Sequence, residues 1–422
     1  MARKGARQTT AEGAQSEGKQ VEKNNLPKTT LTGVNAENTK SVLISAVLEV
    51  HGQVRFGDGT DVGLTITETD MVLRPLDGTQ LQKFIFAGSK RRGVDRRTIH
   101  ELRDQHWEGE QCYIPNLCCA CPTCWLYGFT GTTQDKPINA KSRVLYSSSV
   151  SVEEVQLGVN THSRNQVDEK TQTTAGSAGI HEEQIIVAGV HFPTYTALVR
   201  VLDWEIGLFA HALLENVNSN RYTAASRAQG GMKFAEHDRV PLIIVDESEQ
   251  GIFPLAVPKI AGWENDWQRV SEVFHNALSR AHLQTTLEAQ GFEVVGNNEG
   301  GQTNNQPGLS PDDPQQAQGN EEQQPSTTVN RLTLTESNGV ITVKQNGHVL
   351  MTRYIGEKAL GYLRQKQLTA KQTLTTLKAT AFHPEINSYI AAINPKGGGE
   401  TTVPAGTEDQ DSGGSADVST NE

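Results

Sequence analysis

The stretch "QIIVAGVHFPTYTALVRVLDWEIGLFAHALLENV", residues 184–217, decides the fold class. Its first part, 184–202, is rich in Val, Ile, Thr and aromatic residues, which is typical of β-strands. Its second part, 203–217, repeats apolar residues at helical spacing, and Asp203 stands where an N-cap residue would. The predicted apolar face comprises Ile206, Phe209, Ala210, Leu213, Leu214 and Val217. A strand that runs directly into an amphipathic helix predicts an α+β chain.

Both patterns recur on either side of this stretch. Strands are predicted over 41–56, 81–88 and 141–155, helices over 95–106, 263–287 and 357–366, and a hairpin over 331–350 with turns at Asn338-Gly339 and Asn346-Gly347. The polar stretch 158–184 is too long for a routine connection, so it is either disordered or a functional arm. Its Thr and Val content favours the arm, as an extended β-hairpin that projects from the body. Because these strands must pair across long separations in the chain, we expect an α+β sandwich.

Three segments carry almost no apolar side chains, and we expect them to be disordered: 1–36, 297–330 and 397–422. The chain has a formal net charge of −11. Residues 297–330 hold five carboxylates and residues 400–422 hold six, with no Lys or Arg in either, so the remainder is formally neutral. The negative net charge therefore does not exclude a nucleic-acid partner.

The sequence shows no sign of a membrane or of secretion. Its first residues, "MARKGARQTTAEGAQSEGKQ", lack the apolar run of a signal peptide. No window approaches the roughly 18 apolar residues that a membrane span needs. We therefore expect a soluble, cytoplasmic protein without a membrane partner.

Two segments are candidates for binding phosphates. The run from Lys83 to Arg103 holds seven basic residues against two acidic ones, although charge runs are often ordinary solvated faces. The loop 220–234 holds Arg221, Arg227 and a glycine pair. Glycine lets backbone N–H groups approach a phosphate closely, although such pairs also mark ordinary turns.

All five cysteines lie within thirteen residues of the segment "QCYIPNLCCACPTCWLYG", 111–128. In a reducing compartment this clustering favours a metal over disulfides. Cys118, Cys121 and Cys124 form two overlapping C-x-x-C units, and two thiolates at this spacing can span one edge of a zinc tetrahedron. We predict Cys112 as the fourth ligand of a structural Zn²⁺, with Cys119 as the alternative.

Other ligands and other roles remain open for this segment. His100 and His106 could replace a thiolate, which would give a Cys₃His site. Buried reduced thiols, which pack as small apolar groups, are an alternative to a metal. A redox C-x-x-C is a further alternative, although no thioredoxin-like βαβ pattern surrounds it. A closed four-ligand zinc site stabilises a loop, so function must lie elsewhere.

Six segments resemble, in their order, a known family. They read "FAGSKRRG" with two further arginines (86–97), "CPTCWLYG" (121–128), "INAKSRVLYSSSV" (138–150), "RNQVDEKTQTTAGSA" (164–178), "VHFPTYTALVRVLDWEIGLFAHALL" (190–214) and "NRYTAASRAQGG" (220–231). This succession resembles the backbone subunits of CRISPR effector complexes in the RAMP superfamily. Within it, the chain looks like the Cas-seven family and the Csc-type subunit of type I-D Cascade.

The resemblance implies a fold and its boundaries. We expect a modified RRM (ferredoxin-like) core over 37–296, completed by 331–396. This core would carry a zinc-binding insertion at 95–130 and a protruding β-hairpin thumb at 158–184. In the family such a thumb reaches over the guide–target duplex and displaces a base.

The resemblance also assigns residues to the guide RNA. In the family a G-S-x-x-G motif after a strand holds the RNA backbone. Here the motif comprises Gly88, Ser89 and Gly93, and Ala87 stands in place of the usual proline. The predicted RNA-binding residues are Ser89, Lys90, Arg91, Arg92, Arg96, Arg97, Arg143, Arg164, Arg221 and Arg227.

The implied function is that of a non-catalytic subunit that grips the crRNA along its phosphates while base pairing reads the sequence. The implied partners are crRNA, target DNA, further copies of the chain in a head-to-tail filament, and the large, small, Cas-five-type and Cas-six-type subunits of Cascade. The alternative is a metal-dependent nuclease in which Asp58 or Asp61 of "FGDGTDVG" would hold the ion. An Asp-Gly turn explains these two residues more simply.

Overall fold

The structure is a computed structural model of the chain. It describes residues 39–56, 64–65, 67, 69–105, 112–114, 116–118, 121–130, 139–165, 170–171, 173, 180–223, 230–249, 257–296 and 331–376. The segments predicted to be disordered, 1–36, 297–330 and 397–422, lie outside the described residues. The domain boundaries drawn from the sequence therefore stay predictions.

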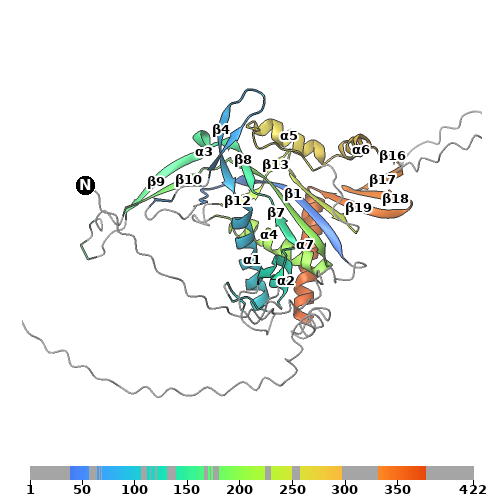
Figure 1. Cartoon of the computed structure of the whole chain (residues 1–422), viewed down its shortest axis with the longest axis horizontal. Helices are drawn as coiled ribbons and strands as arrows, with labels where there is room; N and C mark the ends of the chain where they lie inside the picture. Colours follow the sequence, from blue (N-terminus) through green and yellow to red (C-terminus); the bar gives the residue numbers. More distant parts are fainter. Residues whose placement is uncertain are drawn as a thin grey trace, which may run out of the picture.

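A nine-stranded mixed sheet forms the body of the molecule (Figure 1). Its order is β16-β17-β18-β19-β15-β1-β11-β7, and β12 pairs with the end of β1. The strands are β1 (Lys40–Val50), β7 (Val144–Tyr146), β11 (His191–Val201), β12 (Met232–Phe234), β15 (Ile243–Ser248), β16 (Glu293–Gly296), β17 (Arg331–Ser337), β18 (Val340–Gln345) and β19 (His348–Ile355). The strand predicted at 41–56 is β1, which lies antiparallel between β11 and β15 and ends at Val50.

Four smaller sheets occur in the described residues: β3-β4-β8, β2-β10-β9, β13-β14 and β5-β6. Their strands are β2 (Leu64–Thr65), β3 (Thr69–Leu73), β4 (Gln80–Phe86), β5 (Phe129–Thr130), β6 (Asn139–Ala140), β8 (Ser149–Glu154), β9 (Val159–Asn165), β10 (Ile180–Ile186), β13 (Glu236–His237) and β14 (Val240–Pro241). The antiparallel pair β9 and β10 occupies the predicted hairpin segment and extends away from the large sheet (Figure 1). Its role as a thumb stays a prediction.

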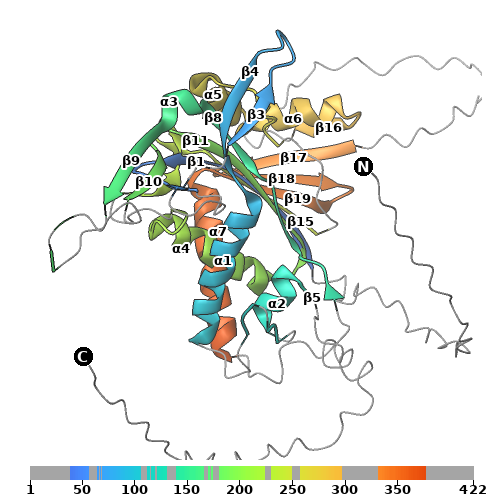
Figure 2. The same cartoon turned by 60° about the vertical axis from the view of Figure 1, so that its left-hand side comes forward.

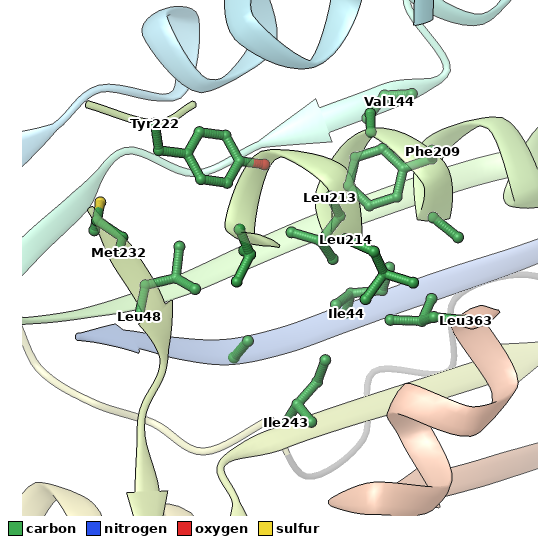
Figure 3. Close-up of a cluster of buried hydrophobic side chains, with 14 of the residues drawn as sticks. Ile44, Leu48, Val144, Phe209, Leu213, Leu214, Tyr222, Met232, Ile243 and Leu363 are labelled. Carbon is green, nitrogen blue, oxygen red and sulfur yellow. The ribbon is translucent and has the colours of Figure 1, made fainter. Parts of the chain in front are cut away.

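Three long helices form a layer against the large sheet (Figure 2): α1 (Gly88–Asp104), α4 (Asp203–Asn218) and α7 (Glu357–Thr376). The other helices are α2 (Pro122–Tyr127), α3 (Val155–Gly158), α5 (Trp267–Ala277) and α6 (Arg280–Ala289). Figure 3 shows how this layer meets the sheet: Ile44 of β1, Phe209 of α4 and Leu363 of α7 meet in one buried cluster. The architecture is mixed α/β with a large mixed sheet, and an RRM-like centre stays a prediction.

Helix α4 confirms the predicted apolar face but corrects its start. The six predicted apolar residues are all buried. The N-cap is Leu202 and not Asp203, because the Glu205 side chain accepts the Leu202 N–H at 2.9 Å. Asp203 instead pairs with Lys366 of α7 at 2.8 Å. Gly207 lets α7 approach closely, since a Cβ there would collide with the Lys366 carbonyl oxygen.

Three predicted element boundaries were wrong or too short. The single helix predicted at 263–287 is two helices, because Ser279 accepts the His282 N–H at 3.2 Å and starts α6. The helix predicted at 95–106 begins at Gly88, and the one predicted at 357–366 continues to Thr376. The Asn-Gly turns between β17, β18 and β19 are confirmed, with positive φ at all four residues. None of the helices in the described residues is both long and apolar enough to cross a bilayer.

Candidate functional site

The four cysteines predicted as metal ligands form a cluster. The Sγ atoms of Cys112, Cys118, Cys121 and Cys124 all lie within 4.8 Å of one another, and none of these thiols is in a disulfide. Zn–S bonds of about 2.3 Å in a tetrahedron would place sulfurs about 3.8 Å apart, so four thiols at this spacing fit such an ion. The cluster can therefore hold a metal ion, and zinc as its identity stays a prediction.

Local structure brings these thiols together. Cys121 is the N-cap of α2, Pro122 occupies the first helical position, and Cys124 follows one turn later. The Sγ of Cys118 accepts the Cys121 N–H at 3.2 Å, and Arg103 of α1 donates to the Cys121 Sγ at 3.5 Å. Hydrogen bonds with the other three thiols lower the pKa of Cys112 well below its usual value. Donors of this kind stabilise thiolates and orient metal ligands.

The alternative ligands are only partly described. Cys119 and His106 lie outside the described residues. His100 lies on α1, but its ring nitrogens do not belong to the cluster of ligand atoms. Arg96 Nε lies 3.3 Å from His100 Nε2, and burial, followed by the charge of Arg103, lowers the pKa of His100 to about 4. Among the described residues, the geometry favours four sulfur ligands.

The G-S-x-x-G motif forms the first turns of α1 and is not a loop. One residue, Ala87, separates β4 from this helix. Its φ of −60° falls within the range to which proline is restricted, about −65 ± 15°, so alanine here adopts the conformation that the family's proline would impose. The first turn has no side-chain cap and no acidic residue. An uncapped helix N-terminus of this kind attracts anions.

The predicted cations on α1 differ in how far they reach solvent. Ser89 and Arg97 are exposed, Lys90, Arg92 and Arg96 are half-buried, and Arg91 is buried. Arg92 donates to the carbonyl oxygen of Tyr127. The Gly88 N–H has Ser148 Oγ at 3.3 Å, whereas the Ser89 N–H has no acceptor in the described residues. The predicted groups on α1 that are exposed to solvent are therefore Ser89 in the first turn and Arg97 in the third, whereas the Nζ of the half-buried Lys90 lies 3.5 Å from the Phe56 carbonyl oxygen.

Arg91 belongs to the core. Its side chain donates to Thr196 Oγ1 of β11 at 2.8 Å and to the Ser147 carbonyl at 3.4 Å. Its guanidinium also lies 5.3 Å from the centre of the Tyr146 ring. A guanidinium that is 2% exposed and bonded in this way positions α1 against the sheet. The structure thus separates Arg91 from the surface cations on the same helix.

A fully buried carboxylate completes this arrangement. Asp95 accepts hydrogen bonds from Tyr146 and Tyr222 at 2.6 Å each and from Asn216 Nδ2 at 2.7 Å. Burial raises the pKa of Asp95, and these hydrogen bonds oppose that shift. The network joins α1 to β7, to the end of α4 and to the chain that follows it. Sequence reasoning missed it, because an aspartate inside a basic run gives no sign that tertiary structure buries it.

The arginines predicted outside α1 have structural partners where they are described. Arg143 forms a two-pronged ion pair with the buried Glu205 and also donates to the Arg200 carbonyl at 3.0 Å. Arg221 pairs with Glu101 of α1. Of Arg164 the structure describes the backbone, which pairs with His181 in β9-β10, and Arg227 lies outside the described residues. Asp58 and Asp61, the predicted alternative catalytic residues, also lie outside them. The predicted RNA-binding set as a whole stays a prediction.

Comparison with known proteins gives one match in sequence. Residues 76–236 match the family model described as "Csc2 Crispr". Over these residues the chain is similar to the Csc2 CRISPR family. The match covers less than half of the chain, and it contains α1, the cysteine cluster and the β9-β10 hairpin. No curated protein sequence matches the chain.

Two solved structures are weakly similar to the chain. A chain of a structure titled "Type IV-B CRISPR Complex" is 14% identical, with a TM-score of 0.35, over 54% of this chain and 97% of that one. The crystal structure of Thermofilum pendens Csc2 is 13% identical, with a TM-score of 0.35, over 58% of this chain and 81% of that one. At this TM-score neither similarity establishes a shared fold.

Proposed function

We propose that the chain is a non-catalytic backbone subunit of a CRISPR effector complex, of the type I-D Cascade kind, that holds the guide crRNA along its phosphates. The observation that carries the proposal is the Csc2 family match over 76–236, because this segment begins with β4 and the basic helix α1. Target DNA, further copies of the chain in a filament, and the large, small, Cas-five-type and Cas-six-type subunits are the proposed partners.

The physical basis of guide binding is the N-terminus of α1. A phosphate there would meet the Ser89 N–H and the partial positive charge of a helix seventeen residues long. Lys90 and Arg97 would add charge from the first and third turns. None of these groups reads a base, so the affinity would be independent of sequence, as a guide scaffold requires.

Two other features have supporting roles in this proposal. Arg91 fixes the helix to the sheet and so holds the N-terminus in place without touching RNA. The β9-β10 pair extends from the body, which suits an arm that reaches over a guide–target duplex (Figure 2). A zinc ion in the cysteine cluster would stabilise the segment next to α1 and supply no chemistry.

The proposal is tested by the salt dependence of RNA binding. We expect Lys90→Ala with Arg97→Ala to weaken binding of crRNA and to reduce the slope of log K against log salt by about 1.4, since each single-strand phosphate contact contributes about 0.7. The folded structure should survive because neither side chain is buried. Arg331→Ala with Arg364→Ala, two exposed arginines remote from α1 in the sequence, is the matched control and should leave the slope unchanged. An unchanged slope in the α1 variant would mean that this basic run is only a solvated face.

A further inference from the structure

A basic cleft lies in the C-terminal part of the fold, away from the cations of α1. It has a volume of about 670 Å³, within the range of about 300–1,000 Å³ that is usual for small-molecule sites. Three elements contribute a cation each: Arg239 from the turn between β13 and β14, Arg280 from the first position of α6, and Lys358 from the first turn of α7. We call it the α6 cleft. Figures 1 and 2 both place α6 apart from α1.

The three cations of the α6 cleft have no direct ion-pair partner among the described residues. Arg239 and Lys358 are exposed and Arg280 is half-buried, and none of them forms an ion pair or hydrogen bond within the described part of the chain. Arg143 and Arg221, by contrast, are paired with the carboxylates of Glu205 and Glu101. Gathering like charges around one cleft is unfavourable unless an anion binds there.

Two carboxylates also line the α6 cleft. Glu357 stands in the first turn of α7, where a negative charge stabilises the helix N-terminus. Glu336 lies on β17 and is exposed. With three permanent cations against two carboxylates, the lining keeps a positive balance. The cleft is therefore suited to one anionic group and not to a long polyanionic stretch.

The start of α6 adds donors to the cations. Ser279, the N-cap, accepts the His282 N–H, and the first turn contains no acidic residue. The N–H groups of Arg280 and Ala281 have no acceptor among the described residues. A phosphate offers more acceptor oxygens than a carboxylate does, so it can satisfy several of these donors at once.

One part of the α6 cleft lining is apolar. Val240, Leu278 and Ile355 line it beside the cations. A free phosphate would leave this surface uncovered, whereas the flat face of a nucleobase would cover it. One anionic group joined to one group with an apolar face would match both parts of this lining, and a nucleotide has both.

We propose that the α6 cleft binds one nucleoside phosphate unit of a single-stranded nucleic acid. Arg239, Arg280 and Lys358 hold the phosphate, and the base lies against the half-buried Val240 and Ile355. This site is separate from the guide surface on α1 and does not depend on it. A free nucleotide offers the same phosphate and base, and an acidic peptide offers competing negative charge. The test therefore distinguishes a nucleic-acid strand, a free nucleotide and an acidic peptide.

The test uses the full chain carrying Lys90→Ala and Arg97→Ala, which removes the contribution of α1. Binding of a fluorescent uridine decamer is compared between this protein and the same protein with Arg239→Gln and Arg280→Gln. We expect the added pair to weaken decamer binding about tenfold or more and to lower the slope of log K against log salt by about 0.7, the contribution of one single-strand phosphate. The matched control adds Arg331→Gln and Arg364→Gln, which should change affinity less than twofold.

Competition identifies the source of the ligand. Displacement of the decamer by AMP supports the site and shows that it also accepts free nucleotides. Failure of AMP, with the tenfold loss still present, supports a strand as the ligand. Unchanged decamer affinity in the Arg239→Gln, Arg280→Gln protein, with an unchanged melting temperature, overturns the proposal. Displacement by poly-glutamate as effective as that by unlabelled decamer overturns it too, because the cleft would then be a general basic patch.

Discussion

The cysteine cluster and the start of α1 lie on neighbouring elements but are held together by opposite means. Among the described residues, a small apolar cluster surrounds the cysteines: Cys112, Cys121 and Cys124 pack with Trp125 and Phe129, and partly buried side chains lie against them. The first turns of α1 are instead fixed from inside the main core, where Asp95 accepts three hydrogen bonds. Helix α2 joins the two regions: Cys124 and Trp125 belong to the cysteine cluster, and the next two residues, Leu126 and Tyr127, belong to the main core.

The two regions draw their stability from different sources. A cluster of this size contributes little against the entropy of ordering its segment, so we expect a bound ion to stabilise the cysteine region. The α1 network needs no ligand, because the protein itself satisfies its buried charge. Loss of metal should therefore loosen the cysteine region and leave the N-terminus of α1 in place. The following changes test each side in turn.

The largest expected effect comes from removing the buried hydrogen-bond network around Asp95. Asp95→Ala should lower the free energy of unfolding by about 3–5 kcal/mol, because it leaves two tyrosine hydroxyls, one amide and the buried Arg91 without their acceptor or counter-charge. Urea denaturation measures the loss. Gln105→Ala, at an exposed position just beyond the same helix, is the control and should be nearly neutral. A small effect of Asp95→Ala would contradict the importance of the network.

An intermediate effect comes from breaking the metal side. Cys121→Ser with Cys124→Ser should abolish binding of one equivalent of zinc and lower the free energy of unfolding by roughly 2–3 kcal/mol, with new proteolytic cleavage confined to the cysteine region. Elemental analysis of the purified chain measures the metal. Wild-type protein without zinc at one equivalent would remove the metal interpretation and leave buried reduced thiols.

The smallest effect comes from weakening the link between the two regions. Arg103 lies on α1 and donates to the Cys121 Sγ. Arg103→Lys should keep the metal but lower its affinity about tenfold, since residues that hydrogen-bond to metal ligands typically contribute 10–100-fold. Competition with a chelator measures the affinity. Arg97→Lys, on the exposed side of the same helix, should leave it unchanged.

The same two regions show how far the sequence could predict the structure. The cysteine cluster was predictable because C-x-x-C spacing is local and fixes the ligands within a few residues. The Asn-Gly turns and the apolar face of α4 were predictable for the same reason. The sequence could not show which arginines of the basic run are buried. Arg91 and Arg97 look alike in sequence, and only the packing of α1 on β11 and β7 buries Arg91 and leaves Arg97 exposed.

The break between α5 and α6 and the helical form of the G-S-x-x-G motif were missed for a related reason. A serine inside an amphipathic pattern, such as Ser279, cannot be recognised from sequence as a new N-cap. Glycine and serine have low helix propensity, so Gly88-Ser89 did not indicate the start of a helix. The helix nevertheless starts at Gly88, because buried partners hold its Arg91 and Asp95: Thr196 accepts from Arg91, and Asn216 donates to Asp95. Tertiary contacts decided both boundaries.

If this chain carries guide RNA, that RNA should stay bound when the protein is purified from its native cells, and sequencing of the bound nucleic acid will identify it. We expect short RNAs of uniform length that share repeat-derived ends, and a lower yield of them with protein carrying Lys90→Ala and Arg97→Ala. Absence of bound RNA, or a heterogeneous mixture of cellular RNA, would contradict guide binding.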